Sequence, residues 1–404
     1  PGKPSVPVSR RRSAVHNLGR RGRAASRHPA PSSTWTVNLI RAMEGDERFN
    51  SKVLFTGISP CPQPELDQQE IPYDFLELPR PRKRRSEWKA LKAYLESKAP
   101  CIYITNFDFH RSCAVGTLSP NVRVLTVVHS DEERYFDEVE RIGKNCDGIV
   151  AVSDYIAEQL RKRFPGLAER IFHIPYGIPL PTKENDRATS GLLKLAYCNR
   201  LDQYQKRVFD LPEVVRELKK IGITAELTVA GDGQDAKELE KRFQEAGVAN
   251  QVSMVGRVSN ERVTQIFSES HFSLLTSDFE GLPISLLESM ATGCVPCVYK
   301  IKSGVREALT GLLDQCMVGH AEPATMARRI AAIWNNQERW TALSEASRKR
   351  AREMASLENM ANAYQSAFNQ ILSKEIPRSA KIHRPDDIKL PRRIKRRLFS
   401  FFHK

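Results

Sequence analysis

Two glutamates eight positions apart, Glu280 and Glu288, are joined by a Gly-Leu-Pro turn and the apolar start of a helix. Residues 271–275 have the short apolar pattern of a buried strand, so Glu280 follows a strand and Glu288 lies about two turns inside the next helix. Free amides at a helix N-terminus favour a phosphate. The spacing suits two acceptors for different hydroxyls of one sugar nucleotide, although a general acid and base would use the same residue types.

Two cations flank a second loop that follows an apolar segment. Arg200 and Lys206 lie two and eight positions after residues 195–198, which have the pattern of a strand. When a nucleoside diphosphate leaves, negative charge develops on the leaving oxygen, and fixed cations stabilise that charge most in the transition state. We therefore expect Arg200 and Lys206 to hold a diphosphate, with Arg207 as a spare candidate. Ordinary surface charge is the alternative interpretation.

The ordered set of motifs resembles one enzyme family. Residues 278–298 are similar to the Glu-x7-Glu signature of the retaining glycosyltransferases of the glycosyltransferase 4 family, and five further segments agree with this family in order and spacing. These segments are residues 149–156, 174–178, 195–208, 227–233 and 252–257. The resemblance runs from about residue 34 to residue 368. It implies an α/β protein of the GT-B fold, in which two Rossmann-like domains with parallel sheets face each other across a cleft.

The resemblance implies roles for residues of the second domain. Arg200 and Lys206 would hold the donor diphosphate and act in catalysis. Glu280 would bind the donor sugar and also count as catalytic, with the amides of Gly281 and Leu282 nearby. The pair of glutamates then has binding roles and does not act as acid and base.

Further roles concern the ribose and the first domain. Glu288 is expected on the ribose of the donor. His129 follows the β-rich residues 122–128 and matches the family's histidine that faces the donor sugar, so we expect a catalytic role; a core histidine is the alternative. Ser153 is expected to be the N-cap of a helix, and His110 to belong to a loop.

A length of 404 residues suits two domains, and strand-like segments alternate with helical ones between residues 101 and 330. The expected parts are a basic, disordered segment at 1–33, an acceptor-side domain at 34–181, a nucleotide-sugar-binding domain at 191–356, a helix at 357–373 that crosses back to the first domain, and a basic, aromatic tail at 374–404. The family's first strand is not recognisable, and Asn199 stands where the family often has Gly. The chain starts without Met, so we expect a truncated, processed or misassigned start.

The net charge of +15 is concentrated at the two ends of the chain. Residues 1–43 contain nine Lys and Arg and no acid, residues 374–404 contain eleven against three acids, and the rest is nearly neutral. The tail at 390–404 mixes basic residues with Leu and Phe, a composition typical of a membrane interface; a solvated tail is the alternative. The basic run at 80–85 has three interpretations: a loop that faces a membrane or an anionic acceptor, an accidental resemblance to a nuclear-localisation run, or a solvated loop. With no apolar run of transmembrane length, we expect a cytoplasmic enzyme, peripheral on the inner face of the membrane.

We expect no metal and no cofactor, because the sequence has no Asp-x-Asp motif that would hold a metal-bridged diphosphate. The eight dispersed cysteines, including Cys294 and Cys297, are expected to be free thiols that pack in the core.

The expected reaction is metal-independent hexosyl transfer, with retention, from a UDP- or GDP-sugar to a glycan or lipid-linked glycan acceptor of a cell-envelope polysaccharide. One alternative is a nucleotide-sugar epimerase of the same fold. Another is a polyanion-binding protein with a vestigial sugar-nucleotide site, although nucleic acid is not an expected partner.

Overall fold

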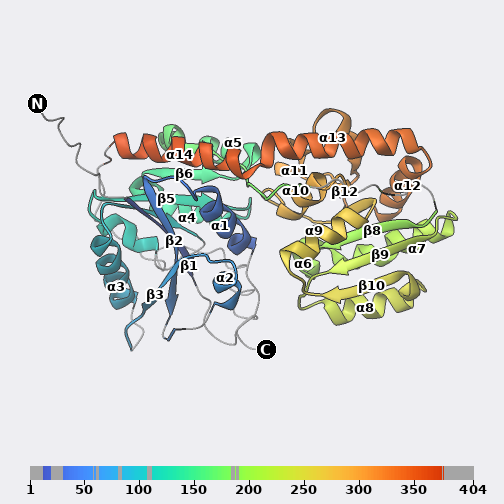
Figure 1. The fold of residues 1–404 in the computed structure, drawn as a ribbon, viewed down its shortest axis with the longest axis horizontal. Coiled ribbons are helices and arrows are strands. Elements are labelled where there is room, and N and C mark those ends of the chain that lie inside the picture. Colours follow the sequence, from blue (N-terminus) through green and yellow to red (C-terminus); the bar gives the residue numbers. More distant parts are fainter. Residues whose placement is uncertain are drawn as a thin grey trace, which may run out of the picture.

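Two parallel β-sheets, each with helices packed against it, form the two halves of the molecule (Figure 1). The structure, a computed structural model, describes residues 12–19, 31–57, 59–60, 63–80, 84–106, 112–182, 187, 191–374 and 376. The predicted α/β fold with two Rossmann-like domains is confirmed.

The first sheet has seven strands in the order β3-β2-β1-β4-β5-β6-β7. Its strands are β1 (Arg12–Gly19), β2 (Phe49–Gly57), β3 (Tyr73–Glu77), β4 (Cys101–Thr105), β5 (Val122–Val128), β6 (Gly148–Ala151) and β7 (Ile171–His173). Its helices are α1 (Pro31–Ala42), α2 (Pro64–Asp67), α3 (Arg84–Ser97), α4 (Glu133–Ile142) and α5 (Asp154–Arg163), with 3-10 turns η1 (Ser112–Thr117), η2 (Gly143–Asn145) and η3 (Pro165–Arg170). Strands β4, β5 and β6 are buried along their whole length, as apolar strands covered on both faces of a parallel sheet must be.

Strand β1 lies within residues 1–33, the segment that is expected from the sequence to be basic and disordered. It pairs in parallel with β2 along its whole length, from Arg12 opposite Phe49 to Gly19 opposite Thr56, and it also pairs with β4. The reason is that β2 and β4 each present an unpaired backbone edge, and a strand between them satisfies both. The surrounding arginines conceal this short segment in the composition. Residues 20–30, which follow β1, lie outside the described part.

The second sheet has six strands in the order β10-β9-β8-β11-β12-β13. Its strands are β8 (Leu193–Cys198), β9 (Ala225–Ala230), β10 (Val252–Gly256), β11 (Phe272–Leu275), β12 (Val295–Tyr299) and β13 (Met317–Val318). Its helices are α6 (Gln203–Lys206), α7 (Leu211–Lys220), α8 (Ala236–Glu245), α9 (Asn260–Glu269), α10 (Ile284–Ala291), α11 (Gly304–Ala308), α12 (Pro323–Trp334) and α13 (Gln337–Ala355), with 3-10 turns η4 (Val208–Asp210), η5 (Ala249–Gln251) and η6 (Gly311–Cys316).

Helix α14 (Leu357–Ser373) returns from the second half of the molecule to the first, following α13 along one side of the structure (Figure 1). Ser356 separates the two helices, and its hydroxyl caps α14 by accepting a hydrogen bond from the Asn359 amide. On the first domain, the Tyr364 ring lies 6.3 Å from the Trp35 ring of α1. The Phe368 ring lies 5.1 Å from that of Phe49. These aromatic contacts attach the C-terminal helix to the first sheet.

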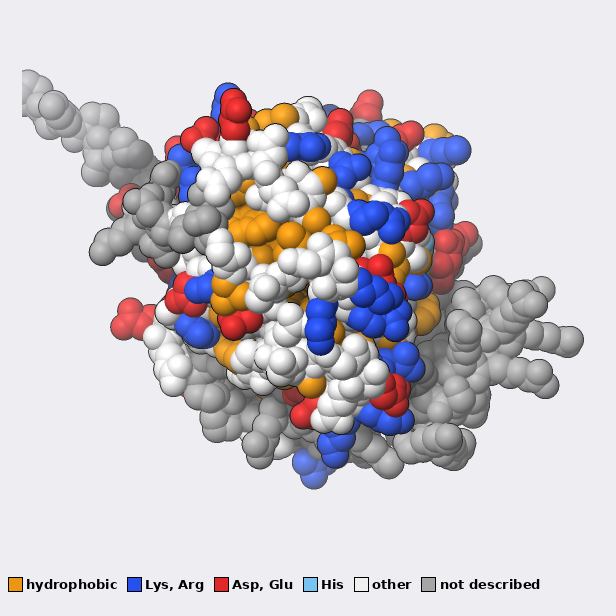
Figure 2. Space-filling model, turned by 90° about the vertical axis from the view of Figure 1, so that its right-hand side faces the viewer, with side chains coloured by type: hydrophobic (Ala, Val, Ile, Leu, Met, Phe, Trp, Pro, Cys, Tyr) orange, Lys and Arg blue, Asp and Glu red, His pale blue; other side chains and the backbone are white. Residues whose placement is uncertain are grey.

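Charged side chains of both signs cover the outer end of the second domain, with Lys and Arg more prominent and an apolar area near the centre of that face (Figure 2). Most of the basic residues at the two chain ends lie outside the described part, as do His110, residues 81–83 of the internal basic run and the tail from residue 377. Among the described residues, none of the helices is both long and apolar enough to cross a membrane.

Candidate functional site

The pairing of β8 with β11 brings together two loops that are far apart in the sequence. Phe272 lies opposite Leu195 in this parallel pair. Because parallel strands end at the same edge of the sheet, the loop after β8 that carries Arg200 and the loop after β11 that carries Glu280 meet there. Between them, Asp202 caps the single turn α6, since its carboxylate accepts from the Gln205 amide at 2.9 Å. This helix replaces the loop that the sequence had suggested.

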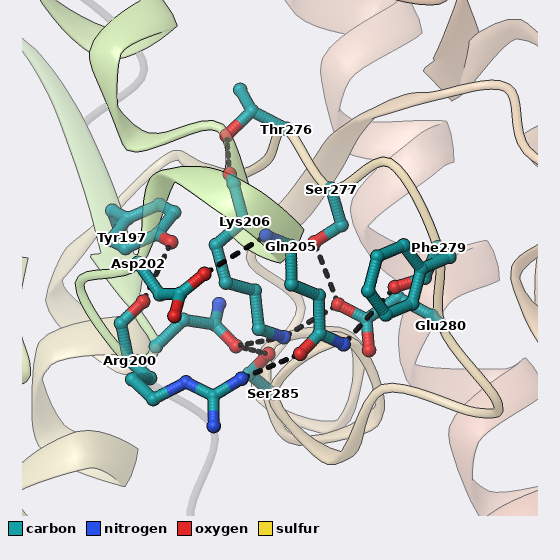
Figure 3. A network of polar contacts seen from close by, with 11 residues as sticks. Tyr197, Arg200, Asp202, Gln205, Lys206, Thr276, Ser277, Phe279, Glu280 and Ser285 are labelled. Carbon is teal, nitrogen blue, oxygen red and sulfur yellow. Dashed lines mark hydrogen bonds and ion pairs between the residues drawn. The ribbon is translucent and has the colours of Figure 1, made fainter. Parts of the chain in front are cut away.

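Lys206 and Glu280 form a buried ion pair at this edge (Figure 3). The ammonium Nζ lies 2.5 Å from Oε1 of Glu280 and also donates to Oδ1 of Asn199 at 3.2 Å. The hydroxyl of Ser277 donates to the same Oε1 at 2.6 Å. Lys206 is 7% and Glu280 6% exposed, so each charge depends on these partners. The hydrogen bonds from Lys206 and Ser277 both go to Oε1, and Oε2 of Glu280 makes none to a described residue.

Arg200 lies beside this pair and is exposed. Its Nη2 donates to Oε1 of Gln205 at 2.6 Å, and Nε2 of Gln205 donates to the carbonyl of Phe279 at 3.1 Å (Figure 3). Gln205 therefore connects the arginine to the loop that carries Glu280. Neither Gln205 nor Asn199 was predicted from the sequence to have a role. The only local signal was the Asp202-x-x-Gln205 spacing, which is typical of a helix start.

The loop after Glu280 packs directly against the first domain. A Cβ on Gly281 would lie 2.1 Å from the carbonyl oxygen of His129, so no other residue fits this close approach. The carbonyl of Gly281 accepts from the Gly304 amide at 2.7 Å. Leu282 is 2% exposed. Helix α10 begins two residues later, so its first amides have no acceptor within the helix and point toward this edge.

His129 contributes its backbone to this contact, while its ring packs among aromatic residues. Nδ1 lies 2.6 Å from the hydroxyl of Tyr176, and the Trp35 ring meets the imidazole edge-on at 4.9 Å. Burial lowers the pKa of His129 to about 3, so the ring is neutral at physiological pH. Nε2 is buried and has no partner among the described residues.

Asp131, two residues beyond His129, is an additional acid near the site. Burial raises its pKa to about 6, and the charges of Glu132 and Glu280 add to the shift. Its Oδ1 is buried without a partner among the described residues. No role was predicted for this aspartate from the sequence.

Glu288 lies on α10 and takes no part in the network around Lys206. Its carboxylate makes no hydrogen bond to a described residue, and burial raises its pKa to about 7. The two glutamates are thus in different environments, one ion-paired and one without a partner.

Local predictions outside the network can also be compared with the structure. Ser153 is the N-cap of α5, as predicted, because its hydroxyl accepts from the Ile156 amide. Cys294 and Cys297 are buried free thiols, also as predicted. No group of three or more His, Cys, Asp or Glu side chains in the described ranges is arranged to hold a metal ion.

Two adjacent family models match this chain. Residues 32–181 match the model described as Glycosyltransferase Family 4, and residues 183–350 match the model described as Glycosyl transferases group 1. Together the two matches cover most of the sequence. The protein belongs to this family of glycosyltransferases, and the expected GT-B fold is that of its structural neighbours.

Three known proteins illustrate the similarity. The putative colanic acid biosynthesis glycosyltransferase WcaL of Escherichia coli (strain K12) is 25% identical over 52% of this chain and 55% of its own length. The lipopolysaccharide 1,6-galactosyltransferase of Salmonella typhimurium is 31% identical over 41% of this chain and 46% of its own. The chain thus spans about half the length of these relatives. Anabaena Alr3699/HepE, solved in complex with UDP, superimposes with a TM-score of 0.70 at 12% identity, covering 89% of this chain and 99% of that one.

Proposed function

We propose that this protein transfers a sugar from a nucleotide-sugar donor to a glycan or lipid-linked glycan acceptor of a cell-envelope polysaccharide. The observation that carries the proposal is the meeting of Arg200, Lys206 and Glu280 at the carboxyl edge of the second sheet. Ligands of open α/β sheets bind at this edge, and two cations beside a carboxylate suit a diphosphate that carries a sugar. The family match supports the same class of reaction.

Each group of the site then has a role toward the donor. Lys206 and Arg200 neutralise the charge that develops on the leaving diphosphate, while Oε2 of Glu280 accepts from a sugar hydroxyl. The first amides of α10 face the phosphates, and Glu288 accepts from the ribose. The neutral His129 lies on the opposite side, next to Gly281.

The proposed transfer retains the configuration at the anomeric carbon and requires no metal. The acceptor attacks from the face that the leaving group departs from, and the leaving phosphate takes the acceptor's proton. In this scheme the residues of the chain bind and orient the substrates and neutralise the charge on the leaving diphosphate. No side chain serves as a dedicated base.

UDP-sugars are the first donors to test, with GDP-sugars second. One relative is named a galactosyltransferase, and one structural neighbour was solved with UDP. The family match does not favour the epimerase or the polyanion-binding alternative.

The test is a panel of UDP-, GDP- and ADP-sugars, scored by thermal shift and then by transfer to lipid-linked glycans. We expect one nucleotide class to stabilise the protein. Lys206→Ala should lower the transfer rate at least about 100-fold, a loss typical of a residue that stabilises transition-state charge. Glu288→Ala should also lower the rate severely, because it removes the group proposed to hold the ribose of the donor. Lys241→Ala, a change at an exposed lysine of α8, is the matched control and should turn over normally.

Near-wild-type turnover of both site variants would refute the assignment. Nucleic-acid binding that weakens steeply with salt, without any nucleotide-sugar effect, would instead favour the polyanion-binding alternative. Membrane binding through the tail at residues 390–404 stays a prediction, and co-sedimentation with anionic vesicles tests it.

A further inference from the structure

Asn199 connects the two halves of the candidate donor site. Its Oδ1 accepts a hydrogen bond from Nζ of Lys206 at 3.2 Å and another from the hydroxyl of Ser285 at 3.0 Å. Lys206 belongs to α6, and Ser285 to the first turn of α10 (Figure 3). One amide oxygen thereby joins the cation to the helix whose N-terminus faces the same edge of the sheet.

The backbone holds this asparagine rigidly at the end of β8. Its amide donates to the carbonyl of Ala230 at 3.1 Å. A Cβ on Gly231 would lie 1.9 Å from the carbonyl oxygen of Asn199, and Gly231 has a φ of +141°. The two backbone segments are therefore in contact at a point where only glycine is tolerated. The backbone of Asn199 is therefore held in place, which restricts the positions that its side chain can take.

A neutral acceptor in this place has a specific electrostatic advantage. An ammonium has three N–H donors, and Lys206 uses one on Glu280 and one on Asn199, which leaves one for a ligand. Because Glu280 already balances the ammonium, a second carboxylate would make the cluster net negative and would repel a diphosphate, whereas an amide oxygen orients the ammonium and adds no charge. A glycine, which the family often has at this position, cannot supply this contact.

We propose that Asn199 is a positioning residue that holds the Lys206 ammonium in place for a nucleoside diphosphate. The inference rests on the proposed function and adds a residue that acts through Lys206. Its effect depends on the phosphates of the ligand and not on the base or the ribose.

The first experiment compares UDP with uridine by calorimetry on the full chain. Asn199→Ala should weaken UDP binding about 10-fold and leave uridine binding unchanged, because only UDP carries the phosphates that meet Lys206. Gln265→Ala removes an exposed side-chain amide of α9 that donates to Glu269, outside this network, and is the matched control, with UDP affinity within about twofold of the wild type. Equal losses in both variants, or equal weakening of UDP and uridine by Asn199→Ala, would overturn the proposal.

The second experiment needs no ligand. Melting temperatures of the wild type, Asn199→Ala, Lys206→Ala and the double variant form a cycle. Asn199→Ala should lower the melting temperature less in the Lys206→Ala background than in the wild type, because the contact is already lost there. Equal lowering in both backgrounds would refute the contact. If the wild type binds no nucleoside diphosphate, the proposed function fails, while the cycle still decides whether Asn199 holds Lys206.

Discussion

Two charged residues of the site, Lys206 and Glu280, are buried and depend on each other for the compensation of their charges. Lys206 and Glu280 are almost fully buried, yet each has a partner of opposite charge and a neutral polar neighbour. Removing one member of such a pair leaves an uncompensated charge in the interior, which costs about 3–5 kcal/mol. A substitution at either position therefore combines a loss of binding with a loss of stability, so folding must be measured together with activity.

Glu288 predicts a pH dependence. Burial raises its pKa to about 7, so the folded state favours the neutral form. The stability that this carboxyl contributes is complete below about pH 4.5 and is lost as the pH rises through 7. Glu288→Gln should therefore gain at least about 1 kcal/mol relative to the wild type between pH 5 and pH 8, as measured by denaturant unfolding. A difference that does not change with pH would contradict the raised pKa.

Among the secondary-structure elements, the short helix α11 connects the loop that contains Gly281 with the first domain. The amide of Gly304 donates to the carbonyl of Gly281 at 2.7 Å. At the other end of the helix, Oε2 of Glu307 accepts from the Asp154 amide at 2.8 Å, and Oε1 lies 2.9 Å from Nε2 of His173. This single helical turn thus contacts the loop that contains Gly281 and also α5 and β7 of the first domain.

Glu307 should make the stability of the protein dependent on pH. Burial alone would raise its pKa, but the hydrogen bonds from His173 and the Asp154 amide outweigh this effect, and the pKa is lowered. Its contribution is present above the unfolded pKa near 4.5 and is lost as the pH falls below that value. Glu307→Gln should lower the free energy of unfolding by about 1–2 kcal/mol at pH 7, with the difference shrinking below pH 4.

Chemical unfolding at pH 3.5, 5 and 7 checks this prediction, with Glu345→Gln on the exposed side of α13 as the control. The control should match the wild type at every pH. An equally large effect of Glu307→Gln at all three values would show that its carboxylate charge is not involved.

At the scale of the whole molecule, β1 decides whether the first sheet is continuous. It lies between β2 and β4, and without it the seven-stranded sheet would divide into one part of two strands and one of four. A chain that lacks residues 1–30 should therefore lose cooperative unfolding of its first domain, because two strand edges become unpaired. Removing residues 377–404, which contain none of the described elements, is the control and should leave the unfolding transition unchanged.

Calorimetry combined with limited proteolysis would follow the two domains separately. If the shortened chain keeps a first domain as resistant to protease as that of the full chain, the central place of β1 is refuted.

Local patterns predicted the elements that depend on neighbours in the sequence. The strand near residues 271–275, the strand at 122–128 and the N-cap at Ser153 agree with the structure, because hydrophobic runs and capping signals act over a few residues. Strand β1 was missed, since its pairing partners begin some 35 and 90 residues later and its flanks are rich in arginine.

The sequence by itself determined the family, the α/β class and the residue types of the candidate site. Only the tertiary structure decided that Lys206 and Glu280, 74 positions apart, share a buried hydrogen bond, and that Asn199 joins Lys206 to α10. It also showed that Gly281 touches His129 of the other domain. The physical reason is that residue type and short spacing are properties of the chain, whereas the pairing of β8 with β11 and the packing of the two domains determine which charges meet.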